Sequence, residues 1–168
     1  MIALNIPDRK EFTKALFIGN VFDRFLLSEA SITTFCTFSI DGALHRNFYS
    51  TEEQDCMKLE ERAFSLWKEC KPFCFSVIKG THTPLHFRFV FQLSRRDMEQ
   101  FLISCGIPMS VDDVFGLFLN VTFDGTSLTC TTGTSMRMFT LDKTLDNSWD
   151  NWIMSFFRQN GLAAEKIS

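Results

Sequence analysis

The sequence predicts an α+β protein in which helices pack on a predominantly antiparallel sheet. Its strands show strict alternation of apolar and polar residues, most clearly from Leu85 to Leu93 and from Val114 to Asp124. Two helical segments each follow a strand directly, so we expect the strands and helices to pack together in one domain. The C-terminal region adds an amphipathic helix whose apolar stripe consists of Trp149, Trp152, Ile153, Phe156 and Phe157.

Length and composition favour one domain with a large core. The chain has 168 residues, of which 45% are hydrophobic and 22% are charged. A chain of this size buries about 70% of its surface on folding, so a core forms without disulfides or metals. Phe is the dominant aromatic residue, with 20 Phe against 3 Trp and 1 Tyr. Because Phe has no polar group, this excess indicates a dry core rather than a wet binding surface.

Charge and cysteine usage suggest a cytoplasmic protein. The formal net charge is −3 and neither half of the chain is basic, so composition gives no sign of a nucleic-acid partner. The N-terminus does not resemble a secretion signal, and no apolar run is long enough to span a membrane. We therefore expect reduced thiols at all six cysteines, namely Cys36, Cys56, Cys70, Cys74, Cys105 and Cys130.

The first fifty residues predict a strand, a helix and a β region. Met1 to Ile6 alternates as a strand does, and Pro7-Asp8 predicts the start of a helix that Gly19 ends. For the β region we expect three strands and a type I′ turn, with strands at Arg24 to Glu29, Ile32 to Ile40 and Ala43 to Tyr49 and the turn at Asp41-Gly42.

The middle of the chain predicts a loop and then a helical connection. Thr51 to Glu61 is acidic and polar, which is typical of a loop or a solvated turn. Ala63 to Ile78 has helical spacing but contains Pro72. Because an interior proline costs about 3 kcal/mol, we expect a kink or two short helices that meet near Lys71 and end at Gly80.

The last half repeats the order of the first. Leu85 to Leu93 predicts a strand with Phe87, Phe89 and Phe91 on its buried face, and Ser94 predicts the cap of a helix. Gly106 and Pro108 end that helix. The remaining expected elements are a strand at Val114 to Asp124, a hairpin turn at Asp124-Gly125, strands at Thr126 to Thr132 and Ser135 to Leu141, and a helix at Asn147 to Asn160.

This order predicts a single α+β domain over residues 1–161, with residues 162–168 as a frayed tail. The units are about 1–50 and 85–141, the helical connection is 62–79, and the C-terminal helix is 147–160. Each unit reads β-α-β-β-β, which suggests an internal duplication. The alternative explanation is chance, because proteins are built from few kinds of secondary structure and the same order can recur without duplication.

Two stretches of the second unit resemble the half-domain of DNA sliding clamps. They are QLSRRDMEQFLISCG and GLFLNVTFDGTSLTCTTGT, a strand and helix followed by paired strands. The resemblance implies a clamp-like fold and, as one hypothesis, a nucleic-acid accessory role. The two helices that would face DNA carry acidic as well as basic residues, so we do not expect a nucleic-acid partner.

The whole chain also resembles a family of short bacterial proteins without an assigned function. The segments that carry this resemblance are SLWKECKPFCFSVIKG, LHFRFVFQLS and LTCTTGTSMRMFTLDKTLDNSWD. It implies a full-length cytoplasmic protein and supplies no catalytic residues.

The sequence contains no concentrated catalytic motif. Cysteine and histidine spacings do not match zinc sites, and no glycine-rich phosphate loop is present, so we expect neither a metal nor a cofactor. One polar cluster is a candidate ligand site. His82, His86 and Arg88 lie close together in the sequence, the last two on the polar face of a strand, where they could bind an anion or an acidic peptide. An ordinary solvated sheet face is the alternative.

Three hypotheses for the function follow. The first is a binding or interaction protein without catalytic activity, whose partner is another protein or a second copy. The second is a small enzyme with its site between the two units, using a cysteine or one of the histidines His45, His82 and His86. The third is the clamp-like accessory protein. The sequence names no catalytic residue.

Overall fold

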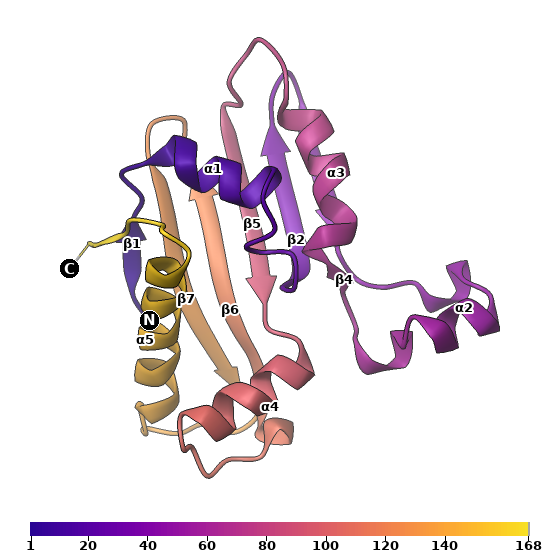
Figure 1. The fold of residues 1–168 in the computed structure, drawn as a ribbon, viewed down its shortest axis with the longest axis vertical. Coiled ribbons are helices and arrows are strands. Elements are labelled where there is room, and N and C mark those ends of the chain that lie inside the picture. The colour runs from indigo at the N-terminus through magenta and orange to yellow at the C-terminus, as the bar shows by residue number, and fades with distance from the viewer. Residues whose placement is uncertain (168) are drawn as a thin grey trace.

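The computed structural model describes residues 1–167 and shows an eight-stranded antiparallel sheet with five α-helices (Figure 1). The strands are β1 (Ala3–Asn5), β2 (Leu26–Thr33), β3 (Thr37–Asp41), β4 (Ser65–Leu66), β5 (His86–Gln92), β6 (Val114–Phe123), β7 (Leu128–Met136) and β8 (Glu165–Lys166). The helices are α1 (Arg9–Phe17), α2 (Thr51–Cys56), α3 (Trp67–Ile78), α4 (Arg95–Ser104) and α5 (Thr144–Gln159). The predicted α+β class is confirmed.

The sheet has the strand order β3-β2-β5-β6-β7-β1-β8, and β4 pairs with the end of β2. Helices α1, α3 and α5 lie in front of the sheet in Figure 1. Side chains that point toward the helices are buried, whereas the opposite face carries partly exposed polar residues such as Asn120, Thr129 and Thr131. The sheet therefore has one covered face and one open face, as antiparallel sheets often do.

Aromatic rings fill the space between the sheet and the helices. Phe89 and Phe91 of β5 are fully buried and both contact Trp67 of α3, with ring centroids 5.1 and 5.2 Å apart. The indole Nε1 of Trp67 donates a hydrogen bond to the carbonyl oxygen of Leu16 at 2.9 Å. The core thus accounts for half of the Phe residues, because ten of the 20 are buried. Five others are exposed, namely Phe35, Phe48, Phe73, Phe115 and Phe139, so the expectation of a dry core holds only in part.

The helix caps and the central strands agree with the sequence. The Oδ1 of Asp8 accepts a hydrogen bond from the Glu11 N–H, and the Oγ of Ser94 accepts one from the Asp97 N–H. Phe87, Phe89 and Phe91 all point into the core. These features depend on local alternation and on capping chemistry, which are short-range signals.

The predicted strand from Ile32 to Ile40 is wrong, because the chain turns in its middle. One strand, β2, runs from Leu26 to Thr33 and pairs with β3 through a turn at 34–36. Asp41-Gly42 is not a hairpin turn. A Cβ at Gly42 would lie 1.8 Å from the carbonyl oxygen of Leu27, so glycine is required by a close backbone approach and not by a turn type.

The segment from 43 to 64 forms an arm instead of a returning strand and a loop. It contains two single 3₁₀ turns, at Arg46–Phe48 and Leu59–Glu61, and the short helix α2. In Figure 1 the part that carries α2 projects away from the sheet. Leu59 is fully buried within the arm, but it is not part of the main core cluster. The strand predicted for Ala43 to Tyr49 therefore does not form, apart from one isolated bridge between Ala43 and Phe64.

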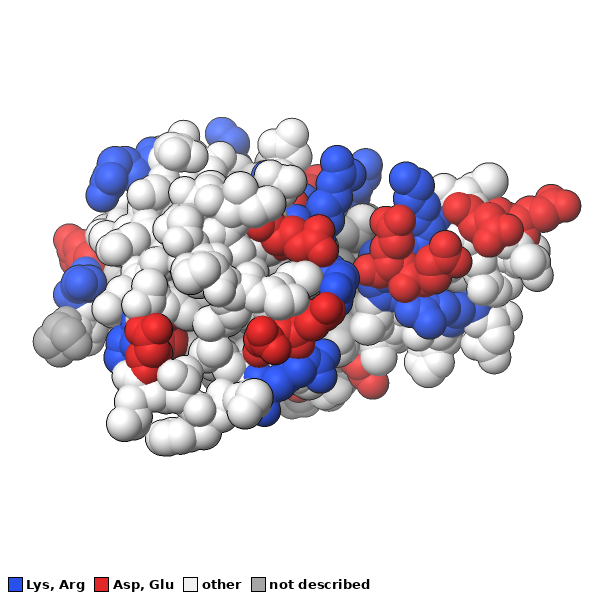
Figure 2. All heavy atoms as spheres, turned by 90° about the horizontal axis from the view of Figure 1, so that it is seen from below, with Lys and Arg blue, Asp and Glu red and all other residues white. Residues whose placement is uncertain are grey.

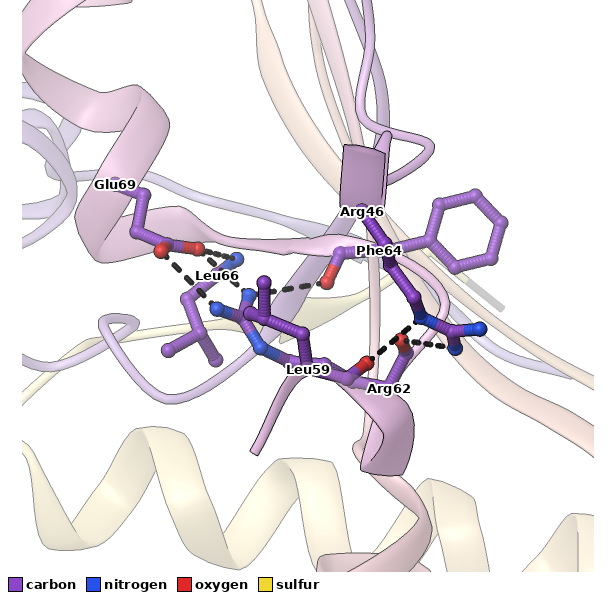
Figure 3. A network of polar contacts seen from close by, with 6 residues as sticks. All are labelled: Arg46, Leu59, Arg62, Phe64, Leu66 and Glu69. Carbon is purple, nitrogen blue, oxygen red and sulfur yellow. Dashed lines mark hydrogen bonds and ion pairs between the residues drawn. The ribbon is translucent and has the colours of Figure 1, made fainter. Parts of the chain in front are cut away.

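Backbone carbonyls of the arm are held by two arginines (Figure 3). Arg46 donates to the carbonyl oxygens of Leu59 and Arg62, each at 3.1 Å. Arg62 in turn donates to the carbonyl oxygen of Phe64 and to both carboxylate oxygens of Glu69. This network ties the arm to the start of α3.

Helix α3 begins at Trp67 and runs through Pro72 without interruption to Ile78. The expected division into two short helices is wrong. Burial of Trp67 and Cys74 on one face of the helix offsets the hydrogen bond that Pro72 cannot donate.

The C-terminal third differs from the prediction in three places. The two strands expected at Thr126 to Thr132 and Ser135 to Leu141 are one continuous strand, β7, and residues 137–143 lie outside any strand. The pairing register shifts between Val114 and Gly116, and this bulge turns Phe115 to solvent. The expected tail is ordered in part, because Leu162 is buried and β8 pairs with β1.

The two β-α-β-β segments occupy the sheet differently. In the second, β5, β6 and β7 are consecutive neighbours, whereas in the first, β1 is separated from β2 by three strands. The internal duplication and the clamp resemblance therefore stay sequence-level hypotheses.

Candidate functional site

A groove of about 1130 Å³ lies between α1, the end of α3 and the turn that joins β6 to β7. Its walls come from segments that are far apart in the sequence. The lining residues on which its chemistry depends are Arg9, Lys10, Lys14, Phe17, Phe75, Phe87 and Phe123. Ligand sites are commonly concave, with an apolar floor and a few polar groups, and this groove has that character.

Helix α1 presents different faces to the core and to the groove. Phe12 and Leu16 are 1% exposed and pack into the core. Lys10 and Lys14 are one turn apart, so they lie on the same side of the helix, and both are exposed. The sequence pattern identifies the core face of this helix. It does not show that the two lysines line a groove, because the groove forms only where α3 packs beside α1.

The floor of the groove contains a row of four phenylalanine rings in contact. Phe75 lies 6.0 Å from Phe17, Phe17 lies 6.3 Å from Phe87, and Phe87 lies 5.3 Å from Phe123, measured between ring centroids. Each ring comes from a different helix or strand. A ligand in the groove would contact an aromatic surface that is already rigidly packed.

Arg9 closes one end of this row. Its guanidinium carbon lies 5.9 Å from the centroid of the Phe123 ring, and its Nη1 donates to the carbonyl oxygen of Thr126 at 2.9 Å. The turn itself is shaped by Asp124, whose Oδ1 accepts hydrogen bonds from the Ser127 N–H, the Thr126 N–H and the Thr126 hydroxyl. These bonds lower the pKa of Asp124 to about 2. Arg9 therefore connects α1 to the turn between β6 and β7 and stabilises this wall of the groove.

None of the cationic groups of the groove, Arg9, Lys10 and Lys14, has an ion-pair partner within residues 1–167. Arg9 is held by the Thr126 carbonyl oxygen, whereas the ammonium groups of Lys10 and Lys14 have no hydrogen-bond partner among these residues. Asp8 caps the helix, so its carboxylate is directed at the backbone. Glu11 is the remaining acidic residue of the wall. The two lysines against Glu11 thus leave a small excess of positive charge beside the apolar floor of the groove.

The predicted ligand cluster lies elsewhere. His86 and Arg88 are on the open face of the sheet, and His82 is exposed in the loop before β5. Arg88 donates to Oε1 of Glu29 at 2.5 Å, which neutralises its charge. In the described part of the chain, neither of these two histidine side chains has a hydrogen bond or an ion pair. His86 and Arg88 therefore share a face of the sheet, and none of the three predicted residues lines the groove.

The partly and fully buried cysteines are poor nucleophiles. Burial, together with the proximity of Cys70, raises the pKa of Cys74 to about 12. Burial also raises the pKa of Cys70 and that of Cys130. Because the thiolate is the reactive form, these thiols are protonated at neutral pH. Among residues 1–167, no group of three or more His, Cys, Asp or Glu side chains is placed to hold a metal ion.

A second surface is apolar and exposed. Phe115, Met138, Phe139 and Leu141 are between 63% and 90% exposed, and they lie at the end of β6 and β7 opposite to the groove. Figure 2 shows this underside of the molecule, where a wide area carries no charged side chains. Arg137 lies at the border of this surface, with its guanidinium carbon 5.8 Å from the centroid of the Phe115 ring. Exposed apolar areas of this kind often mark contacts with other proteins.

The fold and the groove define an antiparallel α+β protein with a ligand-sized, apolar-floored cleft. Residues 15–165 match the family described as a family of unknown function, DUF5721, and the chain belongs to that family. A comparison with curated proteins and one with solved structures gave no match. Membership in an uncharacterised family confirms the resemblance seen in the sequence, whereas bacterial origin stays a prediction. Within residues 1–167, no helix combines the length and the apolar character that crossing a bilayer requires.

Proposed function

We propose that this protein is a non-catalytic binding protein whose groove holds a small amphipathic carboxylate, that is, an apolar chain that ends in a carboxylate. The observation that carries the proposal is the pair of unpartnered lysines, Lys10 and Lys14, beside a row of contacting phenylalanine rings. The exposed side chain of Ile18 and the accessible edges of these largely buried rings would cover the apolar chain. Burial stabilises by about 25 cal/mol per Å² of apolar surface. The lysines would pair with the carboxylate at the rim.

The histidines and cysteines support a binding role over an enzymatic one. None of the residues that line the groove is a histidine or a cysteine. The thiols at 70, 74 and 130 are held protonated by burial. The cytoplasm is the compartment we propose, because all six cysteines are free thiols.

Titration calorimetry with dodecanoate, kept below its micelle threshold, tests this proposal. The wild-type chain should bind dodecanoate, and dodecanol should bind at least tenfold more weakly because it lacks the charge. The double variant Lys10→Glu and Lys14→Glu should lose at least tenfold in affinity for dodecanoate. A difference of tenfold corresponds to about 1.4 kcal/mol.

The matched control is the double variant Lys68→Glu and Lys166→Glu, which makes the same change in net charge at exposed positions outside the groove. It should bind dodecanoate as the wild type does. Equal binding of dodecanol and dodecanoate, or equal losses in the two double variants, would show that the lysines of the groove do not recognise a carboxylate.

A further inference from the structure

Strand β3 forms one edge of the sheet. It is the first strand in the order, and within residues 1–167 β2 is the only strand that pairs with it. Edge strands are commonly protected by lysine, proline or a bulge, because their free backbone groups can pair with another strand. The segment Thr37-Phe38-Ser39-Ile40-Asp41 contains neither lysine nor proline, and its register with β2 is regular.

The hydrogen-bond pattern identifies which backbone groups face outward. On either side of β3, the Thr34 N–H donates to the carbonyl oxygen of Cys36 and the Gly42 N–H donates to that of Ser28. Bonded and non-bonded pairs alternate along an antiparallel ladder, so Phe38 and Ile40 are the residues bonded to β2. The N–H and C=O groups of Thr37, Ser39 and Asp41 therefore point away from the sheet.

The side chains of β3 also divide between the two faces. Phe38 lies opposite Ile32 and Ile40 lies opposite Ala30, so both are on the covered face and are partly buried. Thr37, Ser39 and Asp41 are exposed on the open face. An added strand would find apolar contacts on one face and polar contacts on the other.

This short segment is complementary to itself. When two copies pair antiparallel with Ser39 opposite Ser39, all three outward-facing residues form bonded pairs. Phe38 then lies beside Ile40, and Thr37 lies beside Asp41, so no two like charges are opposed. A shift by two residues pairs fewer outward-facing groups, and a shift by one residue sets an outward-facing group against an inward-facing one.

We propose that two copies of this chain associate through β3, in the register that places Ser39 opposite Ser39, to form one continuous sheet. The occupant is a second copy because the register is self-complementary in backbone groups, apolar pairs and charge. The arrangement is an isologous two-fold contact, which closes at the dimer. The contact is small, so we expect a dimer that forms in the micromolar range. This inference does not depend on the groove.

Analytical ultracentrifugation from about 1 to about 200 µM tests the association. The wild type should shift from 19.4 kDa to twice that mass as the concentration rises. Ser39→Lys and Ser39→Glu each place like charges opposite each other across the two-fold axis, where the Cβ atoms of such a pair are about 5.5 Å apart. Each variant alone should dimerise at least tenfold more weakly.

An equimolar mixture of the two variants tests the register, because the lysine introduced in one copy then faces the glutamate introduced in the other. The mixture should therefore recover dimerisation. Thr129→Lys, on the open face of β7, is the control and should dimerise as the wild type does. Ser39 is exposed, so circular dichroism should show the wild-type fold for both variants. A wild type that stays monomeric, variants that dimerise normally, or a mixture that fails to recover would each overturn the proposal.

Discussion

The guanidinium of Arg62 donates two hydrogen bonds to the carboxylate of Glu69, with N–O distances of 2.6 and 3.1 Å. Only 11% of the Arg62 side chain is exposed. Glu69 also accepts a hydrogen bond from the Leu66 N–H, at the start of α3 (Figure 3). One carboxylate thus links the arm that carries α2 to a helix of the core.

This carboxylate should make stability depend on pH. Burial alone would raise the pKa of Glu69, but the hydrogen bonds from Arg62 and Leu66 outweigh it and the pKa is lowered. A lowered pKa in the folded state contributes stability that is present above the unfolded value of about 4.5 and is lost as the pH falls below it. Glu69→Gln should cost about 1–2 kcal/mol near neutral pH.

Urea unfolding at neutral and acidic pH checks this prediction. The difference between wild type and Glu69→Gln should shrink as the pH falls through the folded-state pKa. Glu60→Gln, at an exposed position of the arm, is the control and should have almost no effect at either pH. A cost for Glu69→Gln that is the same at both pH values would argue against an ionic role.

Gly42→Ala should be severely destabilising. A Cβ at this position would lie 1.8 Å from the Leu27 carbonyl oxygen and 2.8 Å from the carbonyl carbon, and backbone atoms of a buried strand cannot move away cheaply. We expect a loss of about 3 kcal/mol or more. Gly19→Ala is the matched control, because its Cβ would come no closer than 3.4 Å to any atom. Similar thermal midpoints for the two variants would contradict the close approach.

Pro72→Ala should stabilise the chain. Pro72 lies inside α3 and cannot donate a hydrogen bond to the carbonyl oxygen one turn earlier, although the helix continues through it. Restoring that donor should add about 1–3 kcal/mol to the free energy of unfolding. Chemical denaturation measures the change, and a lower midpoint for Pro72→Ala would show that the proline is favourable in this helix.

Five of the six cysteines should react in two groups, and the half-buried Cys70 belongs to neither. Cys36, Cys56 and Cys105 are exposed, whereas Cys74 and Cys130 are buried and their pKa values are raised. A thiol-reactive disulfide reagent should modify the three exposed thiols rapidly and the two buried thiols only when the protein unfolds. Rapid modification of Cys74 or Cys130 in the native protein would contradict their burial.

The sequence predicts those parts of the fold that depend on short-range patterns. The alternation of Phe87, Phe89 and Phe91 and the capping residues Asp8 and Ser94 are local signals, and the structure confirms them. The turn at 34–36 lies inside a regular alternation, so pairing of β3 with β2 overrides the local pattern. The role of Gly42 depends on Leu27, which is distant in the sequence.

The groove could not be predicted because its parts meet only in three dimensions. Phe17, Phe75, Phe87 and Phe123 come from four elements, and nothing in the sequence of any one element indicates that the four rings meet. In the sequence, the lysines of α1 look like ordinary exposed residues, because the sequence does not show that α3 lies beside them. His82, His86 and Arg88 attract attention in the sequence because they are neighbours, yet Arg88 pairs with Glu29 on an open face.

Mapping of backbone amide chemical shifts by NMR during a titration with dodecanoate tests the central claim most directly. The account predicts saturable shifts concentrated in α1, in the end of α3 near Phe75 and in the turn from Phe123 to Leu128. Shifts that are absent, or that are confined to the open face of the sheet around His86 and Arg88, would contradict it.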